Sequence, residues 1–177
     1  TIKTSNIVVC FLLCFFVAQA RYIQVPTDYK KIGDALANAD AGDTIKVAKG
    51  VYEENITLIM GVVLLGENPQ TTIIDGGRKG PTVMGTPGAE IGYFTIRNGW
   101  EGILCENATP YIRHNWIIDN HASGIAAFIS LPSIKNNVIY GNRWSGILAW
   151  GTKSLSSKIE QNVIMKNGFS GITIKGH

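Results

Sequence analysis

Four polar residues in the second half of the chain have types suited to acid–base chemistry on a uronic acid. Asp119 and His121 could move a proton, while Arg97 and Arg143 could neutralise a neighbouring carboxylate. A spacing of 22 residues separates Arg97 from Asp119 and His121 from Arg143, so a repeat of that length would align each pair in one column. These four are the catalytic candidates. Ordinary solvated surface charge is the competing interpretation, and it is the one we favour.

Aromatic residues form the second set of candidates. Rows of exposed rings suit the CH faces of sugars, and exposed apolar rows usually mark a binding surface. Three of them precede a repeating glycine by two residues, and two more occupy strand positions expected to face outward. Phe94 is expected in one column with the first of these two, and Phe128 in one column with the second. The competing interpretation is that the rings stack on each other and shield the coil edge. The carbohydrate-binding candidates are Trp100, Trp144, Phe169, Trp116 and Trp150.

A repeat of 22 to 25 residues must position these side chains. A period in this range predicts a solenoid of stacked units, each too small to bury its apolar face alone. The units are rich in β-branched residues and contain no helix-length stretch, so an all-β, single-stranded parallel β-helix with one coil per repeat is expected. Three columns keep the spacing: Gly102, Gly124, Gly146 and Gly171; Asn98, Asn120, Asn142 and Asn167; Asn115, Asn137 and Asn162.

Alternation within each repeat predicts which side chains face the core. We expect the Asn columns to form hydrogen-bonded ladders at bends, where Asn also tolerates a left-handed backbone. We expect the glycines to be turn residues with positive φ. The predicted inward positions are Ile112, Asn115, Ile117, Ile125 and Ala127; Ile134, Asn137, Ile139, Ile147 and Ala149; Ile159, Asn162, Ile164, Ile172 and Ile174.

Residues 1–20 have the pattern of a signal peptide. Lys3 is their only charge, residues 7–17 are apolar, and residues 18–20 form a small-x-small cleavage site. The apolar run is short for a membrane span, so we expect cleavage, no membrane attachment afterwards, and a secreted, periplasmic or cell-surface location. An uncleaved anchor is the alternative.

Residues 21–177 are expected to form one β-helix domain. A strand at 21–25 precedes a helix that Thr27 or Asp28 could cap and that ends near Ala39, covering the N-terminal end of the core. The chain stops half-way through a coil, so we expect the sequence to be a fragment. The further strands expected in the first half are 44–47, 56–59, 62–65, 72–75, 81–84 and 90–96.

Composition narrows the partners and cofactors. Loss of the leader lowers the formal net charge of +3 by one, which is too weak a charge to favour nucleic acid. Cys105 is the one cysteine left after cleavage, and its column predicts a small buried core residue. His and Met do not cluster, and the Glu53–Glu54 pair reads as a solvated turn, so we expect no metal site and no cofactor.

The stretch from Tyr29 to Leu58, followed by VVLLGENPQTTIID at 62–75, resembles the opening of right-handed β-helix proteins of the pectin-lyase-like superfamily. The segments TPYIRHNWIIDNHASGIAAF and SKIEQNVIMKNGFSGITI are similar to repeats of carbohydrate-binding and sugar-hydrolase domains. The resemblance spans about residues 22–177 and implies a right-handed fold, which hosts many activities. The motifs of pectin methylesterases, polygalacturonases, pectate lyases and mannuronan epimerases are absent, so no functional residue is carried over.

These observations favour a secreted domain that interacts with a polysaccharide, such as a cell-wall or acidic glycan, and has no recognisable active site. One alternative is a lyase, hydrolase or epimerase whose catalytic coils lie beyond residue 177. Another is a structural or adhesin solenoid. The sequence carries no signal for an oligomeric state.

Overall fold

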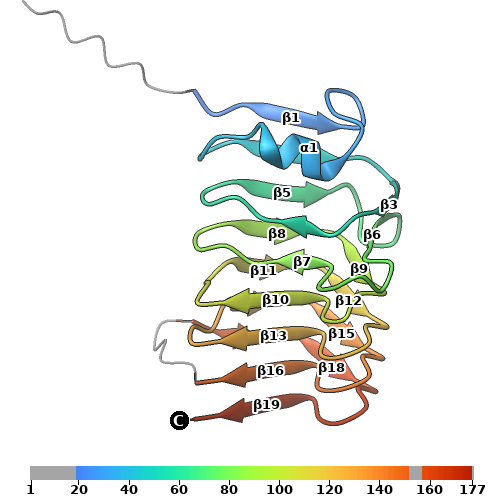
Figure 1. Cartoon of the computed structure of the whole chain (residues 1–177), viewed down its shortest axis with the longest axis vertical. Coiled ribbons are helices and arrows are strands. Elements are labelled where there is room, and N and C mark those ends of the chain that lie inside the picture. Colours follow the sequence, from blue (N-terminus) through green and yellow to red (C-terminus); the bar gives the residue numbers. More distant parts are fainter. Residues whose placement is uncertain (1–18, 152–156, 177) are drawn as a thin grey trace, which may run out of the picture.

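The computed structural model describes residues 19–151 and 157–176, which form three parallel sheets wound into a β-solenoid (Figure 1). The predicted all-β parallel β-helix is therefore confirmed. The predicted signal peptide lies almost wholly outside the described residues. Figure 1 shows the strands stacked from β1 at one end to β19 at the other.

We name the sheets A, B and C in the order in which the chain visits them from β2 on. Sheet A contains β1 (Tyr22–Val25), β2 (Thr44–Val47), β5 (Val63–Gly66), β8 (Glu90–Gly92), β11 (Tyr111–Arg113), β14 (Ser133–Lys135) and β17 (Ile159–Glu160). Sheet B contains β3 (Gly50–Glu53), β6 (Thr72–Asp75), β9 (Thr95–Arg97), β12 (Trp116–Ile118), β15 (Val138–Tyr140) and β18 (Val163–Met165). Sheet C contains β4 (Ile56–Thr57), β7 (Val83–Met84), β10 (Ile103–Glu106), β13 (Ile125–Phe128), β16 (Ile147–Trp150) and β19 (Ile172–Lys175).

The core is a continuous apolar column inside the three sheets. Ile117, Ile125, Ile139 and Ile147 are fully buried, and the register stacks like on like. The predicted inward positions are confirmed up to β16. Ile172, in the last strand of sheet C, is exposed because only one side of it meets another coil.

Both predicted Asn ladders are present in the core. The Asn115 backbone N–H donates to Asn137 Oδ1 at 2.9 Å, and that of Asn120 donates to Asn142 Oδ1 at 3.1 Å. Asn98 is not part of a ladder, because Gly99 occupies that position and donates to Asn120 Oδ1 at 3.0 Å. The expectation of a left-handed backbone at the ladder residues was wrong. It is the residue before each ladder position that has positive φ: Tyr93, His114, Asn136 and Gln161 at one corner, Asn98, Asp119, Gly141 and Lys166 at the other.

The repeating glycines serve packing rather than positive φ, which corrects the prediction. A Cβ on Gly124 would lie 2.7 Å from Ile139 Cγ2 and 2.8 Å from Gly146 O. Such distances are far below van der Waals contact, so only glycine fits between the core and the next coil.

The capping helix α1 (Ile32–Ala37) packs against β1, β2 and β4 and is shorter than predicted. It begins four residues after Asp28, whose side chain instead accepts a hydrogen bond from the Gln24 backbone N–H at 2.7 Å. The first-turn N–H groups of Ile32 and Gly33 donate to the two carboxylate oxygens of Glu54, each at 2.9 Å. Glu54 is therefore the cap, because its negative charge meets the positive end of the helix dipole.

Two strand predictions also change. β3 was not predicted, since Gly50 opens it and its pattern is short. The single strand expected over 90–96 is two strands, β8 and β9, which are separated by a bend at Tyr93 with φ of 66°.

Asp43 fixes the start of the domain and should make its stability depend on acid pH. Its buried carboxylate accepts hydrogen bonds from Arg21 Nη2 at 2.6 Å, the Asp40 N–H at 2.9 Å and the Arg21 N–H at 2.8 Å. These bonds lower the pKa of Asp43 from 3.8 to about 2. The folded pKa lies below the unfolded one, so this stabilisation is complete above pH 4 and is lost as the pH falls through about 2.

We therefore expect Asp43→Asn to lower the melting temperature at neutral pH. The difference from wild type should stay constant down to about pH 5 and shrink towards pH 2, where both carry a neutral side chain. Thermal unfolding followed by circular dichroism across this range measures it. A difference that does not change with pH would contradict the assigned ionic role of Asp43.

Candidate functional site

The aromatic column predicted before the repeating glycines exists in the turn between sheets B and C. Its members are joined by backbone hydrogen bonds from Ala122 N to Trp100 O at 2.6 Å, Trp144 N to Ala122 O at 3.0 Å, and Phe169 N to Trp144 O at 3.0 Å. The exposed fractions are 58% for Trp100, 58% for Trp144 and 77% for Phe169. The chain thus holds three exposed rings on a rigid, hydrogen-bonded edge.

These rings do not stack on each other. In the part of the chain that the structure describes, the only stacked ring pair is Tyr93 with His114. The competing interpretation, in which the column rings shield the edge by mutual stacking, therefore fails for Trp144 and Phe169. Their faces are available to another molecule.

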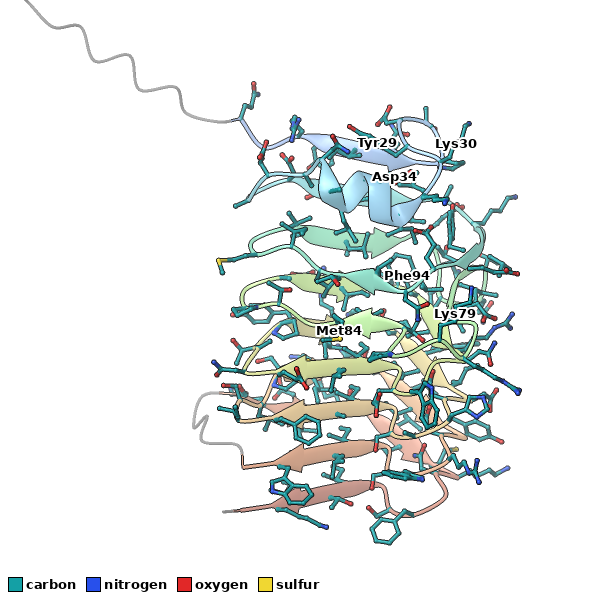
Figure 2. All side chains as sticks on the ribbon, viewed as in Figure 1. Tyr29, Lys30, Asp34, Lys79, Met84 and Phe94 are labelled. Carbon is teal, nitrogen blue, oxygen red and sulfur yellow. The ribbon has the colours of Figure 1, made fainter. Side chains whose placement is uncertain are left out.

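An apolar strip on the outer face of sheet C adjoins the aromatic column. It begins at Met84, labelled in Figure 2, and continues in register through Leu104, Ala126 and Leu148. These side chains face outward, because their neighbours along each strand are the buried core residues. The strip and the column together make a largely apolar surface.

Trp150 stands at the far end of the same strands. It pairs with Phe128 on one side and with Lys175 on the other, as the sequence predicts for Phe128. Lys175 Nζ lies 5.0 Å from the centre of the Trp150 ring, within cation–π range. Sheet C is thus bordered by aromatic rings at both ends of its strands.

Trp116 belongs to a different face, on sheet B. It pairs with Thr95 and Val138, so the predicted column with Phe94 is wrong. Phe94 (labelled in Figure 2) is fully buried and occupies the ladder position before Asn115, whose Oδ1 accepts its backbone N–H at 3.1 Å. The five carbohydrate-binding candidates therefore do not form one surface.

Arg97 is separated from the other catalytic candidates. It pairs with Ile118 rather than Asp119, and its Nε donates to Asp75 Oδ2 at 2.9 Å. Burial alone would raise the pKa of Asp75, but hydrogen bonds from Asn98, Arg97 and the Gly77 N–H outweigh it and lower the pKa. Arg97 is therefore the partner of a structural carboxylate.

Asp119, His121 and Arg143 lie near one another in the turn after sheet B. Asp119 has φ of 53°, so the expected extended segment that would align it with His121 is absent. In the described residues, no hydrogen bond or ion pair links these three side chains. The arrangement holds no preformed acid–base pair.

The match to known families follows from this geometry. The model of the right handed beta helix region matches residues 69–164, more than half of the chain. The chain belongs to this family. No curated protein and no solved structure matches it. The fold expected from the pectin-lyase-like resemblance is thus supported at the level of the right-handed β-helix.

Other features of this right-handed β-helix carry no reactive chemistry. Cys105 is buried in the predicted column with Ala127, and burial raises its pKa to about 12, so the thiol is unreactive. Within residues 19–151 and 157–176, no three His, Cys, Asp or Glu side chains gather as metal ligands would. No helix in these ranges is long and apolar enough to cross a membrane.

A hydroxyl column beside the aromatic one was missed in the sequence. Ser123, Ser145 and Ser170 each follow a member of the aromatic column, with the same spacing of 22 and 25 residues. Ser145 Oγ lies 3.2 Å from Ser170 Oγ and 2.8 Å from Thr173 Oγ1. This part of the β-helix edge is therefore fixed by side-chain as well as backbone bonds, which keeps the aromatic column rigid.

Proposed function

We propose that this β-helix domain binds a polysaccharide along its aromatic edge. The observation that supports the proposal is the column of three exposed, unstacked rings, Trp100, Trp144 and Phe169, on a hydrogen-bonded edge. Rigid aromatic side chains lose little conformational entropy on binding and offer large apolar faces. A sugar ring offers CH groups to such a face and hydroxyl groups to the polar neighbours.

The spacing of the rings favours a chain rather than a single sugar. Trp144 and Phe169 are on adjacent coils, about 5 Å apart along the solenoid axis, and Trp100 is about 10 Å from Trp144. A linear glycan that runs parallel to the axis would meet one ring after another. The apolar strip from Met84 to Leu148 supplies further contact area beside the column.

Residues 1–20 support a location outside the cytoplasm as part of the same proposal. Polysaccharides of the cell wall or matrix are the ligands available there. Sequencing the N-terminus of the exported protein tests this part, and a mature chain that starts at Arg21 is the expected result.

Retention on insoluble polysaccharides tests the binding site. Trp144→Ala and Trp100→Ala should each weaken binding about tenfold, because each removes one exposed ring without touching the core. Tyr22→Ala is the matched control, since Tyr22 is an equally exposed ring on the first strand of sheet A. It should bind as the wild type does.

Wild-type retention that survives both tryptophan substitutions would place the ligand elsewhere. A wild type that is retained by no polysaccharide on a broad panel would rule out the proposal and favour a structural solenoid. Circular dichroism of each variant confirms that the fold is intact.

A further inference from the structure

A groove follows the corner between sheets A and B, on a different part of the surface from the aromatic edge. Two adjoining hollows of about 380 and 470 Å³ share Glu67 and Tyr93, so they form one continuous depression. Its lining comes from the ends of β1, β2 and β5, then from the bends of the next three coils at Tyr93, His114 and Asn136. The groove therefore runs parallel to the solenoid axis, and each hollow has the volume of a typical ligand site.

The second hollow combines two kinds of side chain. Its rings are Tyr93, His114 and Trp116, and its amides are Asn68, Gln70 and Asn136. Amides donate and accept hydrogen bonds at one position, which suits neighbouring sugar hydroxyls, and rings suit the CH faces of the same sugar. This combination distinguishes the groove from the apolar surface over sheet C.

The rings in the groove are held in place. Tyr93 and His114 both have positive φ, and their rings stack with centres 4.9 Å apart and planes inclined by 5°. Arg113 Nη1 donates to Tyr93 Oη at 3.3 Å, and the same guanidinium forms an ion pair with Glu90. A ligand would thus meet a surface that is already ordered, which lowers the entropic penalty of binding.

The opposite wall is a short loop that is equally fixed. Asn68 Oδ1 accepts the Gln70 N–H at 2.8 Å, and Asn68 O accepts the Thr71 N–H at 3.0 Å. The buried hydroxyl of Thr95 donates to Pro69 O at 2.6 Å, which ties the loop to sheet B. The groove therefore has two rigid walls.

The charges of the groove select the kind of sugar. Glu67 is the one carboxylate, and none of the described residues that line the second hollow is a lysine or arginine. Lys46, in the first hollow, has its Nζ 4.7 Å from the centre of the Tyr22 ring. An acidic glycan would find a like charge and no paired cation in the second hollow, and so would be repelled.

We propose that this groove is a second glycan site that binds neutral oligosaccharides, with Trp116, His114 and the three amides as the contact residues. The ligand class rests on the proposed carbohydrate-binding function, but the position of the site does not depend on the aromatic edge. The charge argument also narrows the expected ligand from cell-wall or acidic glycans to neutral ones.

Titration calorimetry with cellohexaose, mannohexaose and hexagalacturonate tests the inference on the wild type and three variants. Trp116→Ala and Asn136→Gly should each weaken binding of a neutral hexasaccharide about tenfold. Asn136 has φ of 56°, so glycine fits its backbone and this variant folds even if Trp116→Ala does not. Trp144→Ala is the control on the other face and should bind the hexasaccharide as the wild type does.

Three results would overturn the inference. Loss of binding in Trp144→Ala alone would move the ligand to the aromatic edge, so that the proposed function survives and the groove does not. Tighter binding of hexagalacturonate than of the neutral sugars would contradict the ligand class. A wild type that binds none of the hexasaccharides would remove the groove site, while retention on polysaccharides would still decide the proposed function separately.

Discussion

Gly124→Ala should lower the free energy of unfolding by about 3 kcal/mol, the upper end of the range for overpacking a core. The added methyl group would lie 2.7 Å from Ile139 Cγ2 and 2.8 Å from both Asn142 Nδ2 and Gly146 O. Relief of these contacts requires the coil to move away from its neighbour, which strains the sheet hydrogen bonds on both sides. Urea unfolding followed by circular dichroism measures the change.

Gly171→Ala is a matched control from the same column. A Cβ there would meet only Ile164 Cγ2, at 3.7 Å, which is ordinary contact. Its stability should therefore stay within about 0.5 kcal/mol of the wild type. Equal losses at the two positions would mean that glycine is needed for its backbone freedom rather than for the close approach of the coils.

Asn142→Ala should have an effect of similar size, about 3 kcal/mol, because it breaks a buried ladder in the middle. Asn142 Oδ1 accepts hydrogen bonds from the Asn120 N–H at 3.1 Å and from Asn120 Nδ2 at 2.9 Å. Its Nδ2 donates to Ile117 O and to Asn167 Oδ1, each at 3.0 Å. The substitution leaves the buried N–H of Asn120 without its acceptor, and thermal or urea unfolding should detect the loss.

Asn38→Ala provides the comparison on the surface. The Asn38 side chain is exposed and donates one hydrogen bond, to Asp34 O at 2.8 Å. Water can replace that bond, so the expected change is within about 0.5 kcal/mol. If Asn142→Ala were no more destabilising than Asn38→Ala, the ladder would contribute little to the stability of the fold.

The repeat allowed most of the fold to be predicted because stacked coils of equal length put identical residues on top of each other. The inward Ile columns, the ladders from Asn115 and Asn120, the buried Cys105 and the aromatic column all follow from the spacing. Their chemistry is the same in every coil, so one coil is enough to interpret the next. The capping helix was also predicted, although its cap was not, because Glu54 reaches it from a later strand.

The errors in the candidate site come from one short turn. The path from β9 to β10 has one residue fewer than the path from β12 to β13, and the structure places the difference between Gly99 and Trp100. His121 therefore has no counterpart in the earlier coil. A spacing of 22 residues aligns Trp100 with Ala122 correctly but misaligns Arg97 with Asp119.

The sequence by itself determined the kind of fold, the core and the exposed aromatic edge, because these depend on the repeat and on alternation within a strand. The tertiary structure decided the register across the shortened turn, and with it the burial of Phe94 and the pairing of Arg97 with Asp75. It also decided the groove at Tyr93, His114 and Trp116. Spacing counts residues, whereas the register depends on the backbone path of each bend, which is fixed only when neighbouring coils pair.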